Sequence, residues 1–128
     1  MSLNYLMTKV SPHVEIYKFP ITAISSITNR VSGLYLTGMF VGCGISGLTN
    51  YDIINSYNQL DKNKRTIVDF SLYLSSSYHI LGGIRHFIWD RNPNLLNNTS
   101  VVKSSYLLFA STIISSLIID KIINKRVK

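Results

Sequence analysis

Residues 78–90 read Tyr-His-Ile-Leu-Gly-Gly-Ile-Arg-His-Phe-Ile-Trp-Asp, and this stretch decides the fold that the sequence predicts. On an α-helix, His79, Gly83 and His86 follow one another at i, i+4 and i+7, so they share one face. Imidazole is a common axial ligand of haem iron, and a glycine one turn away lets a flat macrocycle approach the backbone. A hydrogen-bonded, buried histidine is the competing interpretation of His79. The motif alone leaves both open.

The composition around this stretch is that of a membrane protein. Of the 128 residues, 46% are hydrophobic and only 15% are charged, which is a low charge content for a water-soluble domain. Charges are absent from residues 31–51, 70–84 and 104–119. The first stretch alone has the length of about 20 apolar residues that a span requires. The other two reach it when the charged residues at their ends snorkel to the surface.

The sequence therefore predicts an all-α integral membrane protein with three transmembrane helices, over about residues 21–48, 66–89 and 101–123. Residues 1–20 are predicted to form an amphiphilic arm at the membrane surface, and residues 21–128 to form the membrane domain. The segment 50–65 is expected to be a solvated polar loop. Although the net charge is +7, the basic residues lie at the ends of the apolar stretches and form no clustered patch. We therefore expect no nucleic-acid partner.

Polar residues also gather near the start of the first predicted helix. Ser26 and Arg30 are four residues apart and share a face, and such groups are costly in hydrocarbon unless they face protein, water or a ligand. Alternatively, Arg30 marks the membrane edge and the serines bond to carbonyls of their own helix. These residues alone do not decide between the two interpretations. Ser25 lies about 100° round the helix from Ser26, and we expect it to tolerate alanine.

The two polar sites are predicted to lie at one depth. Consecutive spans run antiparallel, so the start of the first helix and the end of the second lie on the same side of the membrane. At 1.5 Å per residue, Arg30 is about 14 Å beyond residue 21 and His79 is about 14 Å before residue 88. The depth comparison therefore places Arg30 and His79 at the same level.

Two blocks of sequence resemble a known family. Residues 19–33 read Phe-Pro-Ile-Thr-Ala-Ile-Ser-Ser-Ile-Thr-Asn-Arg-Val-Ser-Gly, and residues 79–90 carry His-x3-Gly-x2-His followed by Trp89 and Asp90. Both resemble the cytochrome b subunit of succinate dehydrogenase, respiratory complex II, in its mitochondrial form. Residues 11–17 resemble the segment before its first span. Many members have a histidine where this chain has Asn29. The loop and the third helix carry no resemblance.

The resemblance implies a helix bundle that is shared with a second small anchor subunit in the mitochondrial inner membrane. His79 would be the axial ligand of the haem b iron, and the partner subunit would supply the other ligand. Ser26 and Arg30 would line the ubiquinone pocket, and Arg30 would also lie near a haem propionate. His86 is a possible propionate partner, and Gly83 would pack against the haem.

Further partners follow from the same resemblance. An iron–sulfur subunit and a flavoprotein subunit would deliver electrons from succinate, and membrane lipid would surround the helices. The chain has no flavin, cysteine-cluster or dicarboxylate site, so no catalytic residue is assigned to it and it would act as one subunit of an oxidoreductase. Two alternatives stay open: a structural or assembly anchor without haem or quinone chemistry, and an anchor of a quinol-oxidising fumarate reductase.

Overall fold

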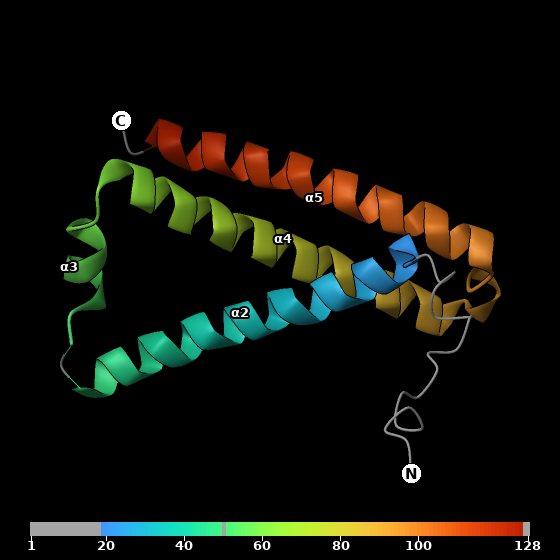
Figure 1. Ribbon diagram of the computed structural model, residues 1–128, viewed down its shortest axis with the longest axis horizontal. Helices are drawn as coiled ribbons and strands as arrows, with labels where there is room; N and C mark the ends of the chain where they lie inside the picture. Colours follow the sequence, from blue (N-terminus) through green and yellow to red (C-terminus); the bar gives the residue numbers. More distant parts are fainter. Residues whose placement is uncertain (1–18, 50, 127–128) are drawn as a thin grey trace, which may run out of the picture.

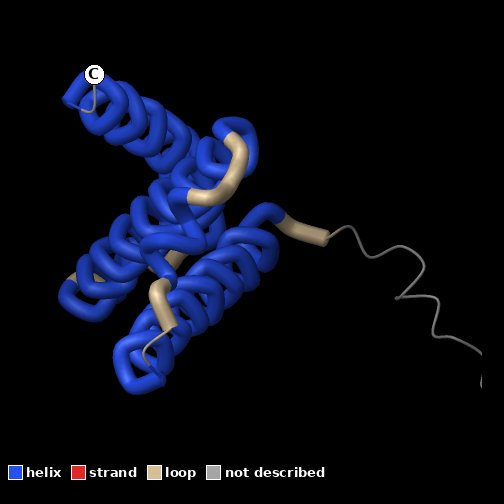
Figure 2. The backbone as a smooth tube through the Cα atoms, turned by 90° about the vertical axis from the view of Figure 1, so that its left-hand side faces the viewer, coloured by secondary structure: helices blue, strands red, loops and turns tan. Residues whose placement is uncertain are grey.

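The computed structural model describes residues 19–49 and 51–126. Its elements are the α-helices α2 (Ile21–Thr49), α3 (Ile53–Asn58), α4 (Lys62–Arg91) and α5 (Asn98–Arg126), with the 3-10 helix η2 (Pro93–Leu95) before α5. The long helices α2, α4 and α5 form an antiparallel bundle, and α3 lies at the end where α2 and α4 diverge (Figure 1). The described residues are helices joined by short loops (Figure 2). Of the predicted surface arm, only Phe19 and Pro20 lie inside the described residues.

Short polar residues set the ends of these helices. At the start of α4, Oδ2 of Asp61 accepts a hydrogen bond from the backbone N–H of Asn63 at 3.4 Å. Before α5, Oδ1 of Asn97 accepts from the N–H of Ser100 at 2.8 Å. Such side chains satisfy N–H groups that have no partner within the helix. Pro93 follows the end of α4, and proline disfavours helical backbone in the residue before it.

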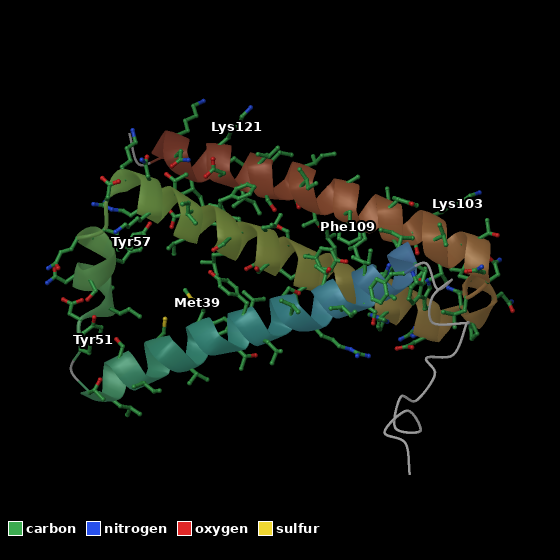
Figure 3. All side chains as sticks on the ribbon, viewed as in Figure 1. Met39, Tyr51, Tyr57, Lys103, Phe109 and Lys121 are labelled. Atoms are coloured by element: carbon green, nitrogen blue, oxygen red, sulfur yellow. The ribbon has the colours of Figure 1, made fainter. Side chains whose placement is uncertain are left out.

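The prediction of a polar loop over residues 50–65 is wrong for most of its length. Asp52 caps α3 by accepting from the N–H of Asn55 at 2.9 Å. Because Asp61 caps α4, this helix begins at Lys62 instead of about residue 66. Tyr57 reaches from α3 to α4, where its hydroxyl donates to Oδ1 of Asp69 at 2.6 Å (Figure 3). The carboxylate partner raises the pKa of Tyr57 to about 12.

The bundle has small polar residues inside and large apolar residues outside. Tyr78 and Leu108 are the buried hydrophobic residues of the described chain, whereas Leu34 is 74% exposed and Phe40 is 77% exposed. The buried polar residues are Ser25, Ser32, Ser77, Ser105, Thr112 and Ser116. In lipid, burial of apolar side chains between helices gives no hydrophobic stabilisation, because the lipid tails are equally apolar. Small residues instead let the helices pack closely. This distribution suits a bilayer and is unfavourable in water.

Two of the long helices have the length and composition of membrane spans. They are α2, over Ile21–Thr49, and the part of α5 over Asn98–Lys125. The second predicted span corresponds to α4, which carries more charge and does not pass the same test. Lys103 and Lys121 lie toward opposite ends of α5 and point away from the bundle (Figure 3). The structure therefore supports a helical membrane protein with two candidate spans.

Candidate haem and quinone site

Two glycines allow α2 and α4 to approach each other closely. A Cβ atom at Gly33 of α2 would lie 2.9 Å from Cε1 of His79 on α4, which is closer than real Cβ contacts. A Cβ atom at Gly82 of α4 would overlap the side chain of Asn29 on α2, with 3.0 Å to its Cγ. Any other residue at either position would have to displace its neighbour. The absence of a side chain therefore fixes the contact that surrounds His79.

The imidazole of His79 is held by the backbone of the neighbouring helix. Its Nδ1 lies 3.2 Å from the carbonyl oxygen of Asn29 and 3.5 Å from the hydroxyl oxygen of Ser32. Because a carbonyl can only accept, a hydrogen bond to Asn29 requires the tautomer with its hydrogen on Nδ1. Ser32 donates to the same carbonyl at 2.8 Å. The other nitrogen, Nε2, then carries a free lone pair and has no hydrogen-bond partner among the described residues. Metal-binding histidines are oriented in this way, by donating their second N–H to a carbonyl.

The motif residues of α4 form an open face. His79, Gly83 and His86 are exposed and fall within an arc of about 60° at 100° per residue. A Cβ atom at Gly83 would meet nothing within 4 Å. His86 packs edge-on against Trp89 of its own helix, with ring centroids 5.4 Å apart. No side chain of the described residues covers this face at Gly83, so a flat group has room to pack there.

Ser26 and Arg30 lie on the part of α2 that borders this face. Together with Gly33 they fall within an arc of about 60° on α2, and Gly33 touches the ring of His79. Arg30 is exposed and Ser26 is half-buried. Neither side chain has a hydrogen-bond or ion-pair partner among the residues that the structure describes. The contact between Asn29 and His79 places Arg30 at the level of His79, as the antiparallel arrangement predicts.

The third helix lies on the other side of α4. Tyr78 and Arg85 of α4 both contact α5, and they lie about 100–120° round α4 from His79. The ring of Tyr78 lies 5.3 Å from that of Phe109 on α5, between centroids (Figure 3). Arg85 donates to the hydroxyl of Ser105 on α5 at 3.1 Å. The face with His79 is therefore left open by α5.

Arg85 is the polar residue whose role the sequence did not reveal. From the sequence it is only a charged helix end that snorkels, but its Nη2 donates to the hydroxyl of Ser25 at 2.8 Å. Ser25 is 0% exposed, and its carbonyl accepts from the hydroxyl of Tyr78 at 3.0 Å. Ser25 is therefore a buried partner of Arg85 and is unsuitable as a neutral control for Ser26. The depth comparison used for Arg30 and His79 could have paired Ser25 with Arg85, since these two also share a level.

Comparison with known proteins finds relatives that match most of this chain. The family model of the succinate dehydrogenase/fumarate reductase transmembrane subunit matches residues 6–119. The mitochondrial succinate dehydrogenase cytochrome b560 subunit of Dictyostelium discoideum is 32% identical over 112 residues, which make up 84% of this chain and 58% of that protein. This chain therefore spans little more than half the length of that relative.

Two further relatives are matched over most of their own length. The succinate dehydrogenase cytochrome b560 subunit of Porphyra purpurea is 32% identical over 107 residues, covering 79% of this chain and 85% of the relative. That of Reclinomonas americana is 30% identical over 118 residues, covering 85% of this chain and 81% of the relative. The resemblance seen in two short blocks is thus confirmed over most of the sequence. The chain belongs to the family of succinate dehydrogenase/fumarate reductase transmembrane subunits.

Proposed function

We propose that this chain is a membrane-anchor subunit of succinate:ubiquinone oxidoreductase in the mitochondrial inner membrane. It binds haem b through His79 and contributes Ser26 and Arg30 to the site where ubiquinone is reduced. The observation that carries this proposal is the environment of the His79 imidazole: Nδ1 lies 3.2 Å from the carbonyl oxygen of Asn29, while Nε2 has no hydrogen-bond partner among the described residues and His79 lies on an open face. The names of the relatives, cytochrome b560 subunits of succinate dehydrogenase, support it.

Each residue of the site has a role that its contacts allow. The carbonyl of Asn29 keeps the N–H of His79 on Nδ1, so that Nε2 is free to bind iron. When bound, haem b supplies a one-electron carrier. Arg30 and Ser26 present donors without partners to a quinone carbonyl oxygen, and the charge of Arg30 stabilises the negative charge that develops there on reduction. In this proposal Arg30 and His86 would also pair with the haem propionates.

The second axial ligand comes from another subunit in this proposal. His86 is the other histidine of the described residues, and in this proposal it would pair with a propionate. A second ligand to the iron would then come from outside the described residues. A second small anchor subunit that covers this face would supply the ligand. The iron–sulfur and flavoprotein subunits complete the path from succinate.

The proposed topology has three spans, with α4 as the second. Its uncharged stretch over residues 70–84 is too short alone, but Arg85 binds serines inside the bundle and does not need to reach water. Apart from Arg85, residues 70–89 contain no charged side chain. A stretch of this length meets the requirement of about 20 residues for a span. Charged residues flank it on both sides, at Asp69 and Asp90.

The test is an optical and kinetic measurement on the purified complex. A reduced-minus-oxidised difference spectrum with dithionite should show a low-spin b-type haem. The complex should also transfer electrons from succinate to a soluble ubiquinone analogue faster than it oxidises the corresponding quinol with fumarate. A complex without a haem spectrum and without quinone reduction would identify the chain as a structural anchor. A faster reverse reaction would point to a fumarate reductase.

A further inference from the structure

Arg85 occupies the junction of all three long helices. It extends from α4 and donates to Ser25 on α2 at 2.8 Å and to Ser105 on α5 at 3.1 Å. Its guanidinium carbon lies 4.5 Å from the centroid of the Trp89 ring. Both serines are 0% exposed. The guanidinium of the half-buried Arg85 is therefore held between the three helices by a fork of two hydrogen bonds and by stacking on an aromatic face.

This cation has no counter-ion among the described residues. Its two hydrogen-bond partners are neutral hydroxyls, and its Nε is buried without an acceptor in the described part of the chain. Asp90 is exposed, and the other described aspartates lie toward the α3 end of the bundle: Asp52, Asp61, Asp69 and Asp120. Because hydroxyls orient toward the charge without cancelling it, no residue of the described chain compensates the positive charge of Arg85.

The charge lies close to the proposed redox site. Arg85 lies six positions beyond His79 along α4, a rise of about 9 Å along the helix axis, and its side chain leaves the helix about 120° round from that of His79. Ser25, the partner of Arg85, directly precedes Ser26 in the sequence. In a low-dielectric interior, a unit charge at such a distance acts much more strongly than it does in water. The field of Arg85 therefore reaches both the group bound by His79 and a quinone beside Ser26.

We propose that Arg85 is an electrostatic tuning residue: its uncompensated positive charge raises the reduction potential of the haem held by His79. One-electron reduction of the ferric group adds one negative charge and no atom, so a nearby fixed cation stabilises the reduced form over the oxidised form. This inference rests on the proposed function because it requires haem at His79. It assigns to Arg85 a role separate from its role in joining the helices.

The test separates the charge of Arg85 from its hydrogen bonds. Potentiometric titration of the haem in the purified complex gives the midpoint potential of the unmodified protein and of three variants. Arg85→Gln removes the charge and keeps a donor, and it should lower the potential. Arg85→Lys keeps the charge and should retain the potential of the unmodified protein. The double variant Ser25→Ala/Ser105→Ala keeps the cation, so its potential should also hold while its thermal stability falls.

Two results would overturn the tuning role. One is a potential of Arg85→Gln equal to that of the unmodified complex. The other is an equal downward shift in the double serine variant, which would assign the effect to lost packing. If Arg85→Gln does not assemble, Ser25→Asp places a carboxylate beside the guanidinium and neutralises it in position. That variant should lower the potential, and an unchanged value would reject the proposal. An unmodified complex without haem would instead reject the proposed function.

Discussion

Nδ1 of His79 lies 3.2 Å from the carbonyl oxygen of Asn29, so the main chain of α2 fixes the imidazole of α4. A main-chain acceptor cannot be removed by replacing the side chain of Asn29. It moves only when α2 shifts relative to α4. The position and hydrogen bonding of the His79 imidazole therefore depend on the residues that control how closely α2 and α4 approach each other.

Replacement of His79 is expected to remove or perturb the b-type haem. Loss of one axial nitrogen changes the spin state and the potential of the iron, so His79→Ala and His79→Tyr should alter the reduced-minus-oxidised spectrum. His86→Ala is the matched control on the same face, and its low-spin spectrum should remain. An unchanged spectrum in both His79 variants would show that iron is ligated elsewhere.

Gly33→Ala should disturb the haem while the ligand is still present. The added methyl would lie 2.9 Å from Cε1 of His79 and must push the ring or the helix. We expect a shifted spectrum or midpoint potential with haem still bound. Gly38 lies on the same helix, and a Cβ atom there would meet nothing within 4 Å, so Gly38→Ala should leave the spectrum unchanged. Equal spectra for the two variants would contradict the close contact between Gly33 and His79.

Gly82→Ala and Gly83→Ala should differ although the glycines are neighbours. A methyl at Gly82 would overlap the side chain of Asn29, and such overpacking typically costs about 1–3 kcal/mol. The thermal midpoint of complex dissociation should therefore fall. Gly83 faces open space within this chain, so Gly83→Ala should preserve that midpoint and alter only the haem spectrum. If Gly83→Ala were the more destabilising variant, the α2–α4 contact described above would be wrong.

Arg30→Leu should lower ubiquinone reduction much more than it lowers electron transfer from succinate to an artificial acceptor. Arg30 is an exposed cation without a partner in the described chain, so its removal should spare the upstream subunits. The ratio of the two activities is the measurement. Arg91→Leu is a suitable control, because Arg91 stacks on Phe87 at 4.8 Å from carbon to centroid and lies at the end of α4. Equal loss of both activities in Arg30→Leu would indicate failed assembly.

Ser26→Ala should weaken ubiquinone binding with little change in haem content. A hydrogen bond from a hydroxyl contributes about 0.5–1.5 kcal/mol net, which is about 2- to 12-fold in the apparent KM for a soluble quinone. Ser25 cannot serve as the control because it binds Arg85. Thr37 is suitable, since its hydroxyl donates to the carbonyl of Gly33 in its own helix at 2.9 Å. A variant Ser26→Ala that lost haem and kept its KM would place the quinone elsewhere.

Sequence periodicity predicted which residues share a face but not how one helix is rotated toward another. The shared faces of His79 with Gly83 and of Ser26 with Arg30 follow from 3.6 residues per turn. The interior position of Ser25 does not, because it depends on the rotation of α2 about its axis. The carbonyl of Asn29 has no signature in a sequence, since every residue has one. The six-residue helix α3 is too short for a periodic pattern, and its capping residue Asp52 was its only signal.

The hydroxyls inside the bundle have a consequence for biogenesis. In α5, Ser105, Thr112 and Ser116 each donate to a carbonyl of α5 itself, at 2.8, 2.7 and 2.7 Å. This helix completes its hydrogen bonds alone and can enter the bilayer without a neighbour. The guanidinium of α4 cannot, because its acceptors lie on α2 and α5. In the proposed topology with three spans, α4 would reach both acceptors only once α5 is present. Because the short 3-10 helix η2 joins α4 to α5, these two helices would insert together as a hairpin.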